Sequence, residues 1–393
     1  MFLTGSNLPV NAAQRRATVD QPSFIFACCQ NGTETALKTE VVRNNPEFRF
    51  SFSRPGFVTF KVSGQRLSAG FDLRSVFART YGISTGRITG QNISAMADDF
   101  WKTADAANIR HLHVWQRDQW LPGERGFEPG VSPLAEQVGI EILERRPRPT
   151  HLERRIKLNQ RARAGGKVLD VVIVEPNDWW CGYHHSDSVT HCWPGGVIEF
   201  DVPVDIASRA FLKTAEALRW SRFPVARGDS CVEIGSAPGG SAQALLERGL
   251  LVTGIDPAPM DKEVAAHPHF THIQKRGADL KRNAFCGFKW LTADVNVAPS
   301  YTLQMVEDIV SCEGVNIRGM LLTLKMIQPE LIEEIPTCVK RIRSWGFEYV
   351  RVRQLAHNRN EVCVAALRTR SMRRKPKSKK KPNSNSAEST PKK

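Results

Sequence analysis

The stretch CVEIGSAPGGSAQALLERG, residues 231–249, decides how the fold of this 393-residue chain is interpreted. It begins with the apolar pattern of a short buried strand and ends with the pattern of a helix. The turn between them carries Gly235, Gly239 and Gly240, which let the backbone turn sharply and approach a ligand closely. Oriented N–H groups at the helix N-terminus add hydrogen-bond donors. The stretch therefore predicts a strand–turn–helix unit that binds a cofactor.

The next apolar strand ends in a carboxylate. LVTGID places Asp256 sixteen residues after Gly240, where a carboxylate can accept both ribose hydroxyls of an adenosine cofactor. A dinucleotide-binding turn shares these features, but its glycines follow G-x-G-x-x-G, and Pro238 fixes φ where that motif needs freedom. S-adenosylmethionine, which lacks a pyrophosphate, fits this turn best, while NAD and a purely structural turn remain open alternatives.

Helix and strand patterns alternate from about residue 205 onward. This alternation predicts an α/β fold over 205–370, a Rossmann-like domain with a mainly parallel sheet and a closing antiparallel pair. Helices are expected at 208–220, 240–249 and 328–345. The expected strands are 231–235, 251–256, 288–295, 319–326, 348–355 and 361–368, the last two forming the antiparallel pair.

Two α+β modules are expected before this domain. FIFACCQ, residues 24–30, is typical of a strand, and 48–62 alternates apolar and polar residues as paired strands do. These segments indicate a first module over 22–80. The strand candidates 111–118 and 168–176 belong to a second module over 81–180.

The chain carries a net charge of +15, which favours a polyanionic partner such as nucleic acid. Residues 371–393 form a basic tail with nine Lys or Arg and one Glu, interpreted either as a solubility tail or as a phosphate-binding arm. Residues 144–167 hold nine Lys or Arg against two Glu. The later part of this segment is expected to be a basic helix ending at 165–166, and we favour an RNA contact over a solvated face. Residues 1–21 are interpreted as a flexible leader.

Nine scattered cysteines match no disulfide framework, so reduced thiols and a cytoplasmic location are expected. No apolar stretch reaches the roughly 20 residues of a membrane span, so no membrane partner is expected.

The linker 181–204 lies in an aromatic, turn-rich region, 177–204, interpreted as a loop packed by its tryptophans. Its histidines and cysteines suggest zinc, but their spacing matches no standard ligand pattern, and no metal is expected. These residues are Cys181, His184, His185, His191 and Cys192.

Four charged residues lie near strand ends or on a helix of the α/β domain. Lys213 is on the helix before the cofactor turn, Asp294 and Lys325 end two strands, and Glu361 begins the last one. Ligands of open α/β sheets collect at the carboxyl ends of the strands. A neutral lysine can remove the proton of a ribose 2′-hydroxyl, and a second cation nearby is expected to lower the lysine pKa. Each residue alone is most simply a surface charge, so the hypothesis depends on their joint placement.

This spread of residues resembles the K-D-K-E tetrad of the FtsJ-type RNA 2′-O-methyltransferases, and more closely their RlmM-type branch, which acts on bacterial 23S rRNA. Four further motifs of that branch are similar to segments of this chain. They are S-R-x-x-L-K at 208–213, G-x-x-P-G-G at 235–240, V-D-x-x-P-M at 255–260 and L-x-x-x-R-x-E-V at 355–362.

The resemblance implies a ferredoxin-like module, then a THUMP-like RNA-binding module, then the catalytic domain. It implies methyl transfer from S-adenosylmethionine to a ribose 2′-hydroxyl, with Lys325 as the proton acceptor. The acceptor nucleotide that it implies is a cytidine of bacterial 23S rRNA. The implied cofactor-site residues are Ser208, Gly235, Ala237, Pro238, Gly239, Gly240, Asp256, Asp279 and Asp294. Asp279 has only a loosely similar context, Glu233 replaces the usual Asp, and Met326 stands where the family usually includes Pro.

Two alternatives remain. The acceptor could be another RNA, although a base methylase is expected to show an N/D-P-P-Y/F motif, and the chain after Asp294 reads VNVAPS. A non-catalytic RNA-binding protein that kept the fold is expected to have lost a member of the tetrad, and all four members are present in this chain.

Overall fold

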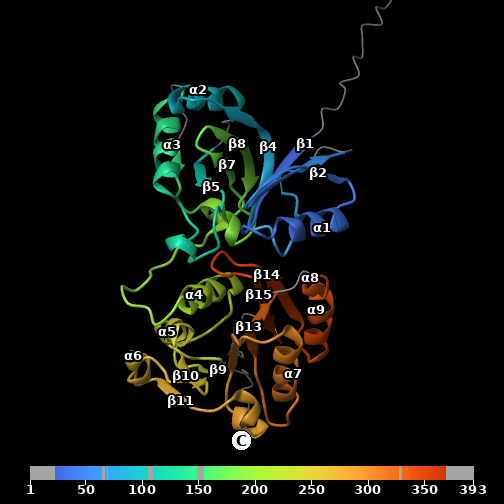
Figure 1. The fold of residues 1–393 in the computed structure, drawn as a ribbon, viewed down its shortest axis with the longest axis vertical. Coiled ribbons are helices and arrows are strands. Elements are labelled where there is room, and N and C mark those ends of the chain that lie inside the picture. The colour runs from blue at the N-terminus through green and yellow to red at the C-terminus, as the bar shows by residue number, and fades with distance from the viewer. Residues whose placement is uncertain are drawn as a thin grey trace, which may run out of the picture.

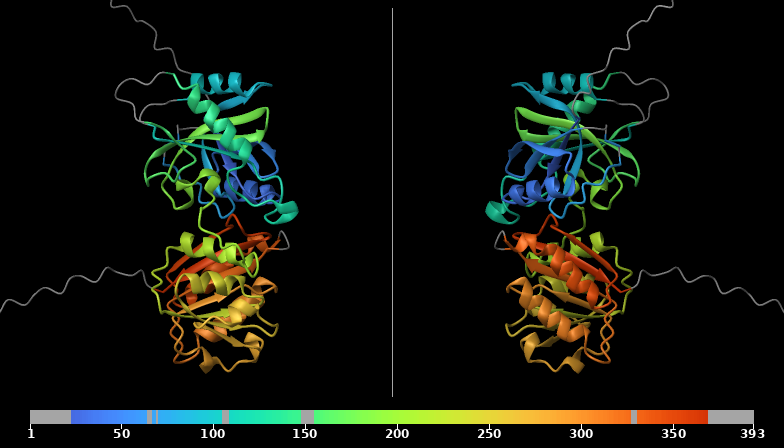
Figure 2. Two further views of the ribbon diagram at one scale, coloured as in Figure 1. Left: turned by 90° about the vertical axis from the view of Figure 1, so that its left-hand side faces the viewer. Right: turned by 90° about the vertical axis from the view of Figure 1, so that its right-hand side faces the viewer.

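The computed structural model describes residues 23–63, 67–68, 70–104, 109–147, 155–326 and 330–368. The expected leader and basic tail therefore lie outside the described residues. The described chain forms two bodies, one above the other along the long axis, each built on its own sheet (Figure 1). Both side views show the same separation into an N-terminal and a C-terminal body (Figure 2).

The N-terminal body contains one continuous eight-stranded sheet, with the strand order β2-β3-β1-β4-β8-β7-β5-β6. Its pairs are antiparallel except for β5, which runs parallel to both β6 and β7. The strands are β1 (Ser23–Cys28), β2 (Phe48–Arg54), β3 (Phe57–Val62), β4 (Thr80–Thr89), β5 (His111–Gln116), β6 (Lys157–Leu158), β7 (Lys167–Glu175) and β8 (Asp178–His185).

Three α-helices pack on this sheet: α1 (Glu34–Asn44), α2 (Ile93–Thr103) and α3 (Pro133–Glu144). Side-chain caps fix where two of them begin. Asn92 accepts a hydrogen bond from the Ala95 N–H before α2, and Ser132 accepts one from the Ala135 N–H before α3. Neither α2 nor α3 was expected from the sequence.

The C-terminal body has the Rossmann-like sheet expected from the sequence, with the order β11-β10-β9-β12-β13-β15-β14. The first five of these strands are parallel, and β15 runs antiparallel between β13 and β14. The strands are β9 (Ser230–Ile234), β10 (Leu251–Ile255), β11 (Phe270–Ile273), β12 (Trp290–Ala293), β13 (Gly319–Lys325), β14 (Tyr349–Arg353) and β15 (Glu361–Leu367).

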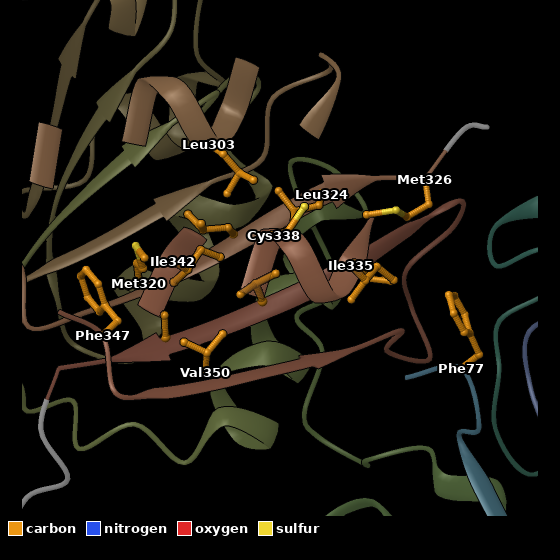
Figure 3. Packing of buried hydrophobic residues seen from close by; sticks show 14 of the residues in the cluster. Phe77, Leu303, Met320, Leu324, Met326, Ile335, Cys338, Ile342, Phe347 and Val350 are labelled. Atoms are coloured by element: carbon orange, nitrogen blue, oxygen red, sulfur yellow. The ribbon is translucent and has the colours of Figure 1, made fainter. Parts of the chain in front are cut away.

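Helices cover both faces of this sheet (Figure 1). They are α4 (Ala210–Ser221), α5 (Gly240–Glu247), α6 (Lys262–Ala265), α7 (Pro299–Val310), α8 (Glu330–Glu333) and α9 (Ile335–Ser344). Figure 3 shows the packing of α7 and α9 against the sheet, where Leu303, Cys338 and Ile342 meet Met320 and Leu324. The same apolar cluster continues through Met326 and Ile335 to Phe77 of the N-terminal body.

Two expectations for the region before residue 204 were wrong. The basic helix before 165–166 is absent from the described residues 155–167, whose backbone pairs instead with the segment 186–192: Ala162 donates to Cys192 and Gly165 to Ser186. The aromatic region after residue 177 is not a loop throughout, because it begins with the eight-residue strand β8. Tertiary pairing outweighs local sequence preference in both places.

Among the helices of the described residues, none is long and apolar enough to cross a membrane.

Candidate active site

Four charged side chains from four elements of the C-terminal body meet in one cluster. Lys213 comes from α4, Asp294 follows β12, Lys325 ends β13 and Glu361 begins β15. The Lys213 Nζ lies 2.5 Å from Asp294 Oδ2 and 3.1 Å from Glu361 Oε1. The Lys325 Nζ lies 2.8 Å from Asp294 Oδ1 and 2.5 Å from Glu361 Oε2. The four side chains thus form a closed ring of alternating charge, which we call the tetrad ring.

The sheet fixes two members of the tetrad ring directly. Lys325 and Glu361 are register partners across the antiparallel pair β13–β15, so their side chains project from the same face. Asp294 follows the parallel strand next to β13, and its backbone N–H donates to the carbonyl of Ile234 at the end of β9. The joint placement expected from the sequence is therefore present, at the carboxyl ends of β9, β12 and β13.

The charges in the ring change the proton affinities of its members. Although burial disfavours its charged form, Lys213 and Lys325 hold the pKa of the Asp294 carboxyl below its ordinary value. Burial favours a neutral Lys325, but Asp294 and Glu361 outweigh it and hold the pKa of the Lys325 amine above its ordinary value. The expectation that the Lys325 pKa is lowered was therefore wrong, because a carboxylate lies on each side of the amine.

Asp256 holds the cofactor turn in shape. Its Oδ2 accepts a hydrogen bond from the Ala237 N–H at 3.1 Å, and its Oδ1 accepts one from the Ala258 N–H at 2.8 Å. Each carboxylate oxygen keeps a second lone pair, so the group can still accept two ribose hydroxyls. The peptide bond between Ala237 and Pro238 is cis.

The glycines of the turn allow close backbone contacts within the protein. Gly235 has φ +82°, and a Cβ atom there would lie 2.4 Å from the carbonyl oxygen of Asp294. A Cβ atom at Gly240 would lie 2.5 Å from the carbonyl oxygen of Ser208. Ser208 and Asp294, both expected at the cofactor site, therefore lie directly against the turn. Gly239 has φ +127° and packs near Met260.

Asp279 is the expected cofactor residue with the weakest structural link to the turn. It ends the short helix η4 (Gly277–Asp279) and is exposed. A Cβ atom on Gly277 would lie 2.9 Å from the Ile234 side chain, so η4 lies beside the end of β9. Among the contacts of the described residues, none joins Asp279 to Asp256 or Asp294.

Glu233 is a site residue for which the sequence predicted no role. Its side chain is 1% exposed beneath the cofactor turn, and Ser236 Oγ donates to its Oε2 at 2.6 Å. Burial raises the pKa of this carboxyl to about 7, and Asp294 and Asp256 add to the rise, while Ser236 and Ser241 oppose it. Its Oε1 has no partner among the described residues. An acid inside the strand pattern of 231–235 is the sequence signal for this residue.

Of the histidines in the region expected to be a loop, His184 and His185 end β8 of the N-terminal sheet, and His191 lies in the short helix η2 (Thr190–Cys192). His113, Asp170 and His184 bring their ligand-type atoms within 4.8 Å of one another. Both His184 nitrogens are engaged, Nδ1 with Asp170 at 2.6 Å and Nε2 with the His191 carbonyl at 2.7 Å. These two acceptors suit a charged imidazolium, which has no lone pair for a metal. The group is therefore explained as a buried ion pair.

The chain is similar in sequence to a known family of methyltransferases and to several curated proteins. The family model of FtsJ-like methyltransferases matches residues 206–370. The Ribosomal RNA large subunit methyltransferase M of Laribacter hongkongensis is 30% identical over 44% of this chain and 51% of its own length. The proteins of that name from Pseudoalteromonas translucida and Teredinibacter turnerae are 27% and 25% identical, over 54% and 86% of this chain and 61% and 97% of their own lengths.

The chain thus spans about half to three fifths of the length of the first two relatives. Among solved structures, TrmN from Thermus thermophilus aligns with 88% of this chain and 99% of its own, at 15% identity and a TM-score of 0.32.

Proposed function

We propose that this chain, whose residues 206–370 are a domain of the FtsJ-like methyltransferase family, methylates a ribose 2′-hydroxyl of large-subunit rRNA with S-adenosylmethionine. The observation that carries the proposal is the tetrad ring, in which two lysines alternate with two carboxylates. Such a ring next to a cofactor turn can bind a hydroxyl and remove its proton in the same place.

The residues that would hold the cofactor lie around the turn. Asp256 would accept the ribose hydroxyls, and Ser208, Asp294, Asp279 and the turn 235–240 would surround the rest of the molecule. The free lone pairs of Asp256 support the fit, because a ligand with ribose hydroxyls supplies donors to these oxygens. When bound, S-adenosylmethionine supplies an electrophilic methyl group on a sulfonium.

In this proposal the Lys325 amine would accept the proton that the 2′-hydroxyl gives up on methylation. Asp294 and Glu361 hold the amine in place from both sides. Lys213 binds the same two carboxylates and places a positive charge beside the developing alkoxide. Because the Lys325 pKa is raised, most molecules carry a protonated Lys325 at neutral pH, and the reaction proceeds through the deprotonated fraction.

The N-terminal body is proposed to bind the RNA. We retain the division into a ferredoxin-like module, 22–80, and a THUMP-like module, 81–180, and note that one sheet runs through both. The relatives' name, Ribosomal RNA large subunit methyltransferase M, supports rRNA as the substrate class. The target cytidine and the cytoplasmic location stay predictions.

The test has two parts. Calorimetry should detect binding of S-adenosylmethionine by the full chain, and Asp256→Ala should remove it, because the ribose hydroxyls lose their acceptor. Ribose-methylation mapping of rRNA from cells with and without the gene should then show one 2′-O-methyl site that depends on it. Binding of NAD in place of S-adenosylmethionine, or identical rRNA maps, would refute the proposal.

A further inference from the structure

The loop that leads from β14 into Glu361 contains a buried asparagine that contacts the tetrad ring. Asn358 is 1% exposed, and its Nδ2 donates to Glu361 Oε1 at 3.4 Å. Its Oδ1 accepts from the Leu355 N–H at 2.9 Å, which fixes the orientation of the amide. Since Lys213 Nζ pairs with the same Glu361 oxygen, Oε1, at 3.1 Å, the amide and the lysine share one acceptor.

The N-terminal body holds this asparagine in place. The Gln30 Nε2, just after β1, donates to the backbone carbonyl of Asn358, and Gln30 Oε1 accepts from Gln354 Nε2 at 3.3 Å. Gln30 is 3% exposed, so the contact is shielded from water. The chain Gln30–Asn358–Glu361 therefore crosses from one body to the other and ends on a tetrad carboxylate.

Two further contacts hold the same junction. The carbonyl of Pro122 accepts from Arg359 Nε at 2.6 Å. Glu128 binds Arg209, which immediately precedes α4 and its Lys213, through two hydrogen bonds of 2.6 and 2.7 Å, and it lies 3.2 Å from His357 Nδ1. The N-terminal body is thus hydrogen-bonded to two segments that carry tetrad residues: the start of α4, which carries Lys213, and the loop before β15, which leads into Glu361. Figure 1 shows the β14–β15 loop at this junction.

We propose that Asn358 is a positioning residue for Glu361, and that the N-terminal body acts through Gln30 to orient this carboxylate in the tetrad ring. The inference rests on the proposed methyl transfer. Glu361 is the only tetrad member among the described residues whose carboxylate receives a neutral side-chain donor in addition to the two lysines. Losing that donor frees the carboxylate to rotate, and both lysines lose the geometry in which they face the hydroxyl.

The experiment compares Asn358→Ala, Asn358→Asp and Gln30→Ala in the full chain, with Arg43→Ala as the matched control. Arg43 binds Glu333 at 2.6 Å and joins the two bodies through exposed side chains away from the loop. Single-turnover transfer of labelled methyl groups to unmodified large-subunit rRNA gives the rate constant and the RNA half-saturation at several pH values. Calorimetry gives the dissociation constant of S-adenosylmethionine.

We expect Asn358→Ala to lower the transfer rate by about 10- to 100-fold, because small misplacements of catalytic groups have effects of this size. RNA half-saturation and S-adenosylmethionine binding should match wild type, and Gln30→Ala should give a smaller loss of the same kind. Asn358→Asp keeps the acceptor for Leu355 but adds a carboxylate beside Glu361, which favours protonated lysines, so its rate should fall below that of Asn358→Ala at every pH. A loss of structure alone would also weaken the binding of S-adenosylmethionine or of RNA. Arg43→Ala should behave as wild type.

An active wild type whose Asn358 and Gln30 variants keep its rate and pH profile would overturn the inference alone. Equal losses in the Arg43→Ala control would also overturn it, because they would reflect general loosening of the junction. A wild type that binds no S-adenosylmethionine and transfers no methyl group would overturn the proposed function, and this inference with it.

Discussion

The Lys325 amine lies between two carboxylates, and this position decides how activity should depend on pH. The proposed reaction requires the base form of Lys325, and the pKa of this amine is held above the ordinary lysine value. The rate should therefore rise about tenfold per pH unit through the neutral and mildly alkaline range without a plateau. Single-turnover rates between pH 7 and pH 9 would measure this slope, and a plateau below pH 8 would contradict it.

Lys325→Arg should remove catalysis while leaving the fold intact. Arginine keeps the charge between Asp294 and Glu361, but it stays protonated in proteins and cannot accept the hydroxyl proton. We expect the transfer rate to fall by about 10²- to 10⁴-fold, the usual contribution of a general base. Binding of S-adenosylmethionine is the control. Near-normal transfer by this variant would mean that positioning alone supplies the rate.

Glu233 should make stability depend on pH in the neutral range. Its pKa is raised from 4.5 to about 7 in the folded protein, so its contribution is fully present below pH 4.5 and is lost as pH rises through 7. The loss amounts to about 3 kcal/mol at most, on the scale of 1.36 kcal/mol per unit. Glu233→Gln should flatten this dependence, measured as the difference in free energy of unfolding between pH 4.5 and pH 8. Parallel curves for the two proteins would disprove it.

At the residue scale, the sequence was sufficient to predict site residues that are both chemically reactive and placed on elements the apolar pattern locates. Asp294, Lys325 and Glu361 lie at strand ends, and Lys213 lies on a helix, that the apolar pattern already located, so their meeting could be expected. Asn358 and Gln30 could not be expected, because their importance depends on a contact across 328 residues of chain. The raised pKa of Lys325 was also missed, since it depends on which charges lie nearest to the amine.

At the element scale, the start of α5 gives a sharp test of backbone packing. A Cβ atom at Gly240 would meet the Ser208 backbone at 2.5 Å, whereas the three atoms nearest to one at Gly139, inside α3, all belong to the Leu158 side chain. Gly240→Ala should therefore cost about 1–3 kcal/mol despite its better helix propensity, and it should weaken S-adenosylmethionine binding. Gly139→Ala is the matched control, because a leucine side chain can move aside. Denaturant unfolding measures both, and equal stabilities would contradict the packing argument.

Elements were predictable from the sequence where pattern and burial agree. The apolar runs of β9, β12 and β13 are largely buried on both faces, as parallel strands usually are. The helix α3 was missed although its signals were present: Ser132 as a cap, Pro133 at the first position, and apolar residues at 135, 138 and 142. The expected basic helix failed for a different reason, because its backbone donors pair with the segment 186–192.

At the scale of the whole molecule, the Arg79–Asp118 ion pair joins remote segments. The pair is bidentate, at 2.6 and 2.7 Å, and both side chains are at most 5% exposed. Arg79 also binds the Gly195 carbonyl, and its own carbonyl accepts from Arg353 of the C-terminal body. Asp118→Asn should cost about 3–5 kcal/mol, because a buried charge loses its partner. Asp99→Asn, which breaks the exposed pair with Lys102, should leave the midpoint of thermal unfolding unchanged.

The charge of the whole chain, +15, predicts salt-sensitive RNA binding. Deleting residues 371–393 should reduce the slope of log affinity against log salt, because fewer counterions are released, and should leave S-adenosylmethionine binding intact. RNA binding at several salt concentrations measures the slope. An unchanged slope and affinity would leave solubility as the role of these residues.

The position of β15 has a consequence for how the protein folds during synthesis. It is the last described strand in chain order, yet it lies between β13 and β14 and carries Glu361. During synthesis the chain must therefore leave a place in the sheet open until residues 361–367 emerge from the ribosome. A nascent chain that has already folded its cofactor turn still has an incomplete tetrad ring. In the proposed function, methyl transfer requires residues 361–367 to have joined the sheet, so a nascent chain that stops short of them would not modify RNA.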